Sequence, residues 1–297
     1  MEYRESNSNQ NYKVLIIVSG LTFTFLIIEV IFGIIANSLA LLADAVHMFT
    51  DSSALALSAF AAWMIHRPAP PEKTYGYYRL EILVALFNGI VLLGSAFFIL
   101  YEAYMRFTSP QTVIGVPMLV VASIGLIVNL VGVYLLRQGA GENLNIQAAF
   151  YEVAKDAFGS VGVIVAGVVV LTTGWPYADP IASLLIAIFI LPRTWKLISQ
   201  AVDILMEASP AKIDIQEVRE AIQKIEEVNY VHDLHVWTIT SGFIALSAHV
   251  VLTNGVNRSQ EQEILTRINQ RLKEKFNLDH TTIQIEYQDL KAKEPQL

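Results

Sequence analysis

Residues 14–36, VLIIVSGLTFTFLIIEVIFGIIA, form an apolar run that contains a single charged side chain, Glu29. A helix that crosses the hydrocarbon core of a membrane, about 30 Å thick, needs about 20 apolar residues, and this run is too long for a strand. The runs of this kind are roughly Val14–Ala36, Leu39–Met64, Leu80–Tyr104, Val116–Leu136, Ile146–Leu171 and Ile181–Ile198. We therefore expect an α-helical membrane protein with six transmembrane helices.

The overall composition supports membrane insertion and excludes several classes of function. The chain of 297 residues is 54% hydrophobic and 16% charged, whereas soluble proteins carry about 25% charged residues. A net charge of −7 argues against nucleic acid as a partner. Because cysteine is absent, disulfides, iron–sulfur clusters and thiolate metal sites are excluded. Any metal must therefore be bound by His, Asp, Glu or backbone oxygen.

Basic residues gather on one side of the predicted membrane, and Lys and Arg favour the cytoplasmic side. The set on that side is Arg4, Lys13, Arg67, Lys73, Arg79, Arg137, Arg193 and Lys196, whereas the other side receives Arg106. With an even number of spans, we expect both termini in the cytoplasm and the protein in the inner membrane. The polar segment 1–13 lacks the pattern of a signal peptide, so we expect it to remain as a cytoplasmic tail.

A small soluble domain is expected after the last span. Apolar residues recur at helical spacing from Ile215 to Ile225, and two strand-like segments flank Ser241-Gly242 as in a hairpin. A second helical pattern around residues 264–272 precedes an alternating segment at 281–287. The order α-β-β-α-β predicts an α+β domain of the ferredoxin-like class, with an open sheet covered by helices.

Ionisable side chains within the spans are costly in lipid and indicate a functional site. His47 and Asp51 are four residues apart in the second span, and Glu152 and Asp156 repeat this spacing in the fifth. Residues at i and i+4 share one face of a helix. If the two spans pack together, one imidazole and three carboxylates converge, and this set suits a tetrahedral divalent ion such as Zn²⁺.

Other polar residues in the spans have competing explanations. Glu29, Asn88 and Asn129 could serve hydrogen bonds between helices. Asp44 precedes His47 by three residues, and Lys155 lies beside the ligand pair of the fifth span. Both are candidates to orient the ligands or to carry protons.

Several stretches give the chain a specific resemblance to the cation diffusion facilitator family over nearly its whole length. They are EVIFGIIANSLALLADAVHMFTD (29–51), KTYGYYRLEILVALFNG (73–89), NIQAAFYEVAKDAFGSVGVI (145–164), TGWPYADPIASLLIA (173–187), VHDLHVWTITSG (231–242) and TTIQIE (281–286). The resemblance implies a homodimeric metal–proton antiporter of the cobalt–zinc–cadmium resistance type. The loop 139–145 contains no histidine, which is similar to bacterial members.

The fifth span departs from the pattern of this family. Zinc-type members carry HxxxD there, whereas this chain has Glu152 in place of the histidine and Lys155 in place of a small residue. Other members hold the same inventory of ligands with the histidine on the other helix, so a metal site is still implied. Selectivity shifted toward Mn²⁺ or Fe²⁺ is the alternative, because harder ions tolerate oxygen ligands better. Lys155 could also pair with Glu152 and weaken the site.

The resemblance further implies metal binding by the cytoplasmic domain. The matching ligand positions are His232, His249 and Glu286, and the weaker candidates are Asp233, His235 and His280. Histidines that are merely exposed on a sheet are the alternative. Arg79 and Glu207 match a charge pair of the family and are expected to lie close together, joining the membrane and cytoplasmic domains. The expected domains are a tail (1–13), a membrane domain (14–207), a metal-binding and dimerisation domain (208–287) and a disordered tail (288–297).

The predicted function is export of divalent metal ions by alternating access. A cytoplasmic ion would bind the four intramembrane ligands and leave outward, and protons would replace it because metal and proton compete for the same atoms. The imidazole of His47 suits this exchange, since imidazole titrates near neutral pH. Zinc is the first expected substrate, Cd²⁺ and Co²⁺ are compatible, and no cofactor is expected. The expected partners are metal ions, protons, the bilayer and a second copy of the chain.

Two functions of other classes compete with transport. An intramembrane metalloenzyme is disfavoured, because the chain has no HExxH or other hydrolase motif and four ligands leave no open position for an activated water. A metal-sensing scaffold would bind the ion without moving it, and flux into sealed vesicles separates the two.

Overall fold

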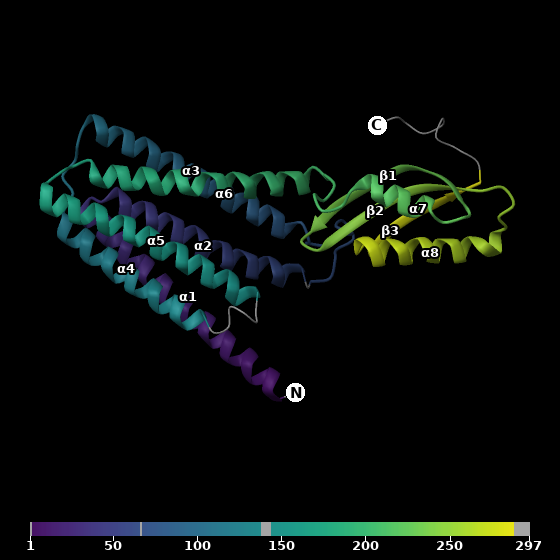
Figure 1. Cartoon of the computed structure of the whole chain (residues 1–297), viewed down its shortest axis with the longest axis horizontal. Coiled ribbons are helices and arrows are strands. Elements are labelled where there is room, and N and C mark those ends of the chain that lie inside the picture. Colours follow the sequence, from purple (N-terminus) through teal and green to yellow (C-terminus); the bar gives the residue numbers. More distant parts are fainter. Residues whose placement is uncertain (1, 66, 138–143, 288–297) are drawn as a thin grey trace. The chain divides into compact units, whose positions relative to one another are not determined.

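The computed structural model describes residues 2–65, 67–137 and 144–287. Six long helices precede a small domain of helices and strands in the described chain (Figure 1). The long helices are α1 (Glu2–Ala36), α2 (Leu39–Ile65), α3 (Leu80–Thr108), α4 (Gly115–Leu136), α5 (Leu144–Thr173) and α6 (Ala178–Leu205). The small domain contains α7 (Ile215–Gln223), β1 (Val228–Thr240), β2 (Phe243–Leu252), α8 (Arg258–Phe276) and β3 (His280–Glu286). The expected disordered tail 288–297 and most of the loop 139–145 lie outside the described residues.

The membrane class predicted from the apolar runs is confirmed. Among the described residues, five helices are long and apolar enough to cross a membrane by length and composition. They are α1 from Val14 onward, α3, α4, α5 from Ala149 onward, and α6. α2, with 27 residues, is the remaining long helix, and its membrane crossing stays a prediction.

Many large apolar side chains of these helices face outward, and small residues lie where helices approach closely. Phe158 and Phe189 are 79% and 81% exposed, as expected for side chains that contact lipid. A Cβ atom on Gly125 of α4 would lie 2.4 Å from the ring of Phe25 on α1, so this close approach requires glycine. Small residues let membrane helices pack closely, and this packing brings polar groups of neighbouring helices into contact.

Two helices, α1 and α6, extend furthest beyond the predicted spans. α1 begins at Glu2 rather than near Val14, because residues 2–13 contain no glycine or proline that would end a helix. α6 continues past the predicted end at Ile198 to Leu205 and contains Pro192, which cannot donate one of the helical hydrogen bonds. Apolar runs predict where a helix lies in lipid, but polar residues can continue the same helix outside it.

The C-terminal sheet has the strand order β1-β2-β3. β1 and β2 form an antiparallel hairpin, in which His232 is the partner of His249, and the turn contains Gly242 at a φ of 77°. β3 follows α8 and pairs in parallel with β2. Apolar residues of α7 and α8, among them Ile222 and Ile268, belong to the buried core of this domain. The predicted order α-β-β-α-β is confirmed.

The chain forms two compact units, Met1–Phe60 with Val84–Ile198, and Ala61–Leu83 with Ser199–Leu297. The segment that links α2 and α3 therefore belongs to the same unit as the C-terminal domain. Within this unit, the carboxylate of Glu81 accepts hydrogen bonds from Thr240 and Ser241 at the β1–β2 turn. Arg79 Nη2 lies 2.8 Å from Glu207 Oε1. The role of this ion pair in joining the domains stays a prediction.

Candidate metal sites

The two ligand pairs predicted from helical spacing meet between α2 and α5. His47 Nε2 lies 3.7 Å from Asp51 Oδ2 on its own helix and 3.9 Å from Asp156 Oδ1 on α5. Ligand atoms of His47, Asp51 and Glu152 all lie within 4.8 Å of one another. The structure therefore brings one imidazole and three carboxylates to one place, which the i, i+4 pattern predicted only on the condition that the two helices approach each other.

Several polar atoms in this cluster lack a hydrogen-bond partner among the described residues. They are Nδ1 of His47, Oδ2 of Asp51 and Oδ1 of Asp156, and all three atoms are buried. A buried polar atom without a partner costs about 1–3 kcal/mol, and natural structures retain few of them. Facing carboxylate oxygens beside an imidazole nitrogen are the donor set that a divalent ion binds.

Glu152 differs from the other ligands because both of its oxygens already contact cations. Arg193 of α6 donates through Nη1 to Oε1 at 2.6 Å and through Nη2 to Oε2 at 3.2 Å. Lys155 Nζ lies 3.2 Å from the same Oε2. The sequence predicted a pair between Lys155 and Glu152 as one alternative. The sequence did not predict the contact with Arg193. The feature that could have indicated it is Glu152 itself, since a carboxylate in place of a histidine within a span needs a compensating cation.

The remaining intramembrane polar residues make contacts of their own. Asp44 is buried, its Oδ1 lies 3.2 Å from the position that a Cβ on Gly159 would take, and its carboxyl group interacts with that of Glu29. Among the described contacts, no hydrogen bond joins Asp44 to His47, so its proposed roles stay predictions. The amides of Asn88 and Asn129 donate to Thr50 O at 3.1 Å and to Ser160 Oγ at 3.4 Å. Both amides thus form hydrogen bonds between helices.

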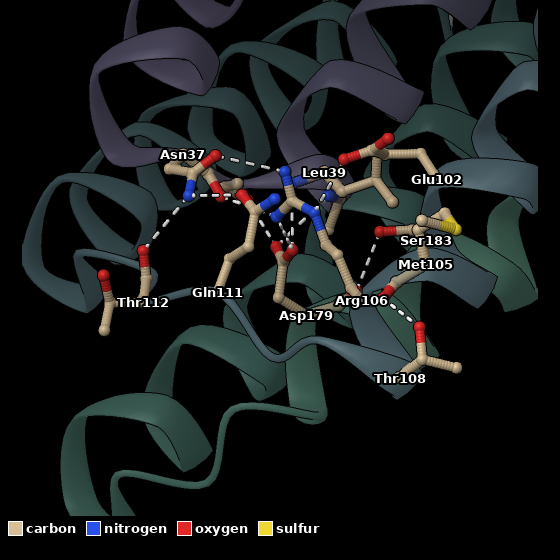
Figure 2. A network of polar contacts seen from close by, with 12 residues as sticks. Asn37, Leu39, Glu102, Met105, Arg106, Thr108, Gln111, Thr112, Asp179 and Ser183 are labelled. Atoms are coloured by element: carbon tan, nitrogen blue, oxygen red, sulfur yellow. Dashed lines mark hydrogen bonds and ion pairs between the residues drawn. The ribbon is translucent and has the colours of Figure 1, made fainter.

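A buried carboxylate holds the start of α2, the helix that carries His47 and Asp51 (Figure 2). Asp179, at the start of α6, is fully buried and accepts hydrogen bonds from the backbone N–H of Leu39 at 2.9 Å and of Ala40 at 3.2 Å. The hydroxyl of Ser38 donates to it at 2.6 Å. A carboxylate at a helix N-terminus satisfies free N–H groups and complements the helix dipole.

Arg106, in the last turn of α3, completes this arrangement. Its Nη1 donates to Asp179 Oδ2 at 3.2 Å and to the backbone oxygen of Asn37 at 2.7 Å (Figure 2). Asn37 has a positive φ of 52° and directly follows the last residue of α1. One ion pair therefore connects the α1–α2 turn with α3 and α6. From the sequence, Arg106 was predicted only to lie on the other side of the membrane from most basic residues, and Asp179 falls between the fifth and sixth predicted spans.

A second cluster forms on the C-terminal sheet. The Glu286 carboxylate of β3 lies 3.1 Å from His232 Nε2 and 3.0 Å from His249 Nδ1. His232 and Glu286 are buried and His249 is partly buried, and ligand atoms of the three lie within 4.8 Å of one another. Two imidazoles and a carboxylate are ligands that Zn²⁺ commonly uses. The residues present therefore fit a zinc ion.

Of the weaker candidate ligands, Asp233 and His235 lie at the edge of this cluster, whereas His280 lies elsewhere on the sheet. Asp233, at a bulge of β1 with a φ of 46°, has one oxygen 3.9 Å from His249 Nε2 and the other 2.9 Å from His235 Nε2. His280 packs edge-on against Tyr75 and Phe243, with ring centroids 5.8 and 5.3 Å apart. His280 is the first residue of β3 and Glu286 is the last, so the two side chains lie at opposite ends of the strand.

Comparison with known proteins matches both parts of the chain. The family described as the cation efflux transmembrane domain matches residues 15–206, and the cytoplasmic domain of the cation efflux protein matches residues 210–288. The metal cation efflux system protein CzcD of Cupriavidus metallidurans is 44% identical over 93% of this chain and 87% of its own.

Two further relatives have similar coverage. A cadmium, cobalt and zinc/H(+)-K(+) antiporter of Bacillus subtilis is 40% identical over 94% of this chain and 90% of its own. The zinc transporter ZitB of Yersinia pestis is 38% identical over 95% and 90%. The resemblance seen in the sequence motifs is thus confirmed, and the chain belongs to the cation efflux family of multi-pass membrane transporters.

Proposed function

We propose that this protein exports divalent metal ions, zinc first, from the cytoplasm in exchange for protons. The observation that supports this most strongly is the buried group of His47, Asp51 and Asp156 between two helices. Three polar atoms of this group lack a hydrogen-bond partner among the described residues, and the imidazole lies 3.7 and 3.9 Å from the two carboxylates. A permanently empty group of this kind would destabilise the fold. A site that alternately holds a metal ion and protons accounts for its composition.

The exchange follows from the chemistry of the ligands. A metal ion and protons compete for the same imidazole nitrogen and carboxylate oxygens, so binding of one releases the other. Alternating access then requires that the helices expose the cluster first to the cytoplasm and then to the outside. The basic residues at the ends of the spans support an inner-membrane protein with both termini in the cytoplasm.

The proposed function predicts uptake of Zn²⁺ by proteoliposomes that contain the purified protein and have an acidic interior. Collapse of the pH gradient with a protonophore is expected to slow uptake by at least about tenfold, because protons then no longer leave in exchange. Binding of Zn²⁺ without uptake would instead indicate a sensing scaffold, and uptake that ignores the gradient would contradict proton coupling. Cd²⁺, Co²⁺ and Mn²⁺ in parallel assays define the selectivity.

The same proposal includes a regulatory zinc site on the cytoplasmic domain and a homodimer. His232, His249 and Glu286 would hold this ion, because their side chains already converge within the sheet. The ion pair of Arg79 and Glu207 would help to hold the segment between α2 and α3 to the C-terminal domain. Binding of a metal ion is expected to stabilise the domain, because only the folded domain brings the three side chains together to bind the ion.

His232→Ala is expected to weaken zinc binding at the cytoplasmic cluster by at least about tenfold, because it removes one of three ligands. The measurement is titration of the full-length protein against a fluorescent chelator, in an Asp51→Ala background that removes the membrane site. His280→Ala is the matched control, since His280 lies on the same sheet away from the cluster. Equal losses in the two variants would contradict the assignment of this site.

A further inference from the structure

The four ligands of the membrane site fall into two groups. Asp51 and Asp156 each have a buried oxygen without a hydrogen-bond partner among the described residues. Glu152 is different, because the guanidinium of Arg193 contacts both oxygens and Lys155 contacts one of them. The buried oxygens of the two aspartates thus face an imidazole, whereas both oxygens of the glutamate are engaged by positive side chains of the protein itself.

The geometry of the Arg193–Glu152 pair is that of a specific interaction. Two parallel N–H···O contacts between a guanidinium and a carboxylate are the strongest form of such a pair. They occupy oxygen lone pairs that a metal ion would need. A divalent ion and a guanidinium also repel each other at such short distance. Direct binding of a metal ion by Glu152 therefore requires Arg193 to move away.

Arg193 has room to make that movement. Its side chain is 54% exposed, whereas that of Glu152 is 25% exposed. Arg193 is also on α6, while the ligands are on α2 and α5. A change in the position of α6 relative to α5 would alter the pair without disturbing the i, i+4 spacing of the ligands. The guanidinium stays charged throughout. Whether it competes with the metal ion therefore depends on where the side chain lies and not on its charge.

We propose that Arg193 is a tethered cation that occupies Glu152 in the metal-free site, competes with the transported ion and lowers its affinity. This proposal rests on the proposed transport function and adds a residue to it. A transporter must release its cargo as well as bind it, and return of Arg193 to Glu152 assists release. Arg193 and Lys155 thus compensate the negative charge of Glu152, which stands where the family pattern has a histidine.

The test is a double-mutant cycle on zinc affinity in the full-length protein. All variants carry His232→Ala, so that the membrane site dominates the titration against a fluorescent chelator. Arg193→Gln is expected to tighten zinc binding by about two- to fivefold, the scale of a partly exposed charged pair. In a Glu152→Gln background the same change is expected to have no effect, because the competing contact is already absent. Arg193→Lys, which keeps the charge but loses the fork, is expected to give a smaller gain.

Lys196→Gln is the matched control, because it removes a positive charge from the exposed face of the same helix. Unchanged or weaker zinc binding in Arg193→Gln would overturn the proposal, as would a gain that persists in the Glu152→Gln background or appears equally in Lys196→Gln. If Arg193→Gln fails to fold, the Arg193→Lys cycle decides in its place by the same criterion. Failure of the transport function itself is separate, since it would appear as zinc binding without zinc uptake by proteoliposomes that contain the unmodified protein.

Discussion

Asp51→Ala and Asp156→Ala are each expected to reduce zinc uptake by proteoliposomes by at least about a hundredfold. Each change removes one ligand of a small site, and loss of even a group that supports a ligand costs about 10- to 100-fold in metal affinity. The remaining imidazole and carboxylates would hold the ion too weakly to compete with protons. The folded structure should persist, because neither carboxylate takes part in the buried ion pair between Arg106 and Asp179.

The matched control is Asp203→Asn, since this exposed carboxylate lies on α6 outside the ligand cluster. Its uptake rate should equal that of the unmodified protein. Size-exclusion chromatography and thermal unfolding establish that all variants fold. Normal uptake by both Asp51→Ala and Asp156→Ala would refute the assignment of the transport site.

Asp179→Ala is expected to destabilise the helical domain by about 3–5 kcal/mol, the cost of leaving one partner of a buried ion pair unpaired. The side chain of Asp179 is fully buried and that of Arg106 is 6% exposed, so water cannot replace the lost contact. The change also removes the acceptor for the N–H groups of Leu39 and Ala40 at the start of α2. Thermal unfolding in detergent measures the loss, and uptake should fall with it because α2 carries two ligands.

Glu102→Ala separates this effect from a general change of charge. Glu102 contacts the same guanidinium at 3.5 Å but is 27% exposed, and partly exposed pairs contribute about 0–1 kcal/mol. Asp179→Asn should lie between the two, because an amide oxygen can still accept hydrogen bonds without the charge. A thermal stability of Asp179→Ala equal to that of Glu102→Ala would show that the buried ion pair does not hold the α1–α2 turn.

Apolar runs and helical spacing were sufficient to predict the membrane class, the C-terminal element order, and which polar residues of α2 and of α5 share one helix face. His47 and Asp51 must share a face because 3.6 residues make a turn of helix, and the same applies to Glu152 and Asp156. Hydrophobic length likewise requires most of these helices to lie in lipid. These properties are local, since each depends on residues within one helix.

Contacts between helices far apart in the chain could be found only in the tertiary structure. Arg193 reaches Glu152 and Asp179 reaches the start of α2 across 41 and 140 residues of sequence. The three strands likewise bring Glu286 to His232 and leave His280 at the opposite end. Side-chain identity indicates that a charge needs a partner, but only the packing of whole helices and the register of strands decide which partner lies within reach. The physical reason is that a charge pair depends on separation in space, which local periodicity does not determine.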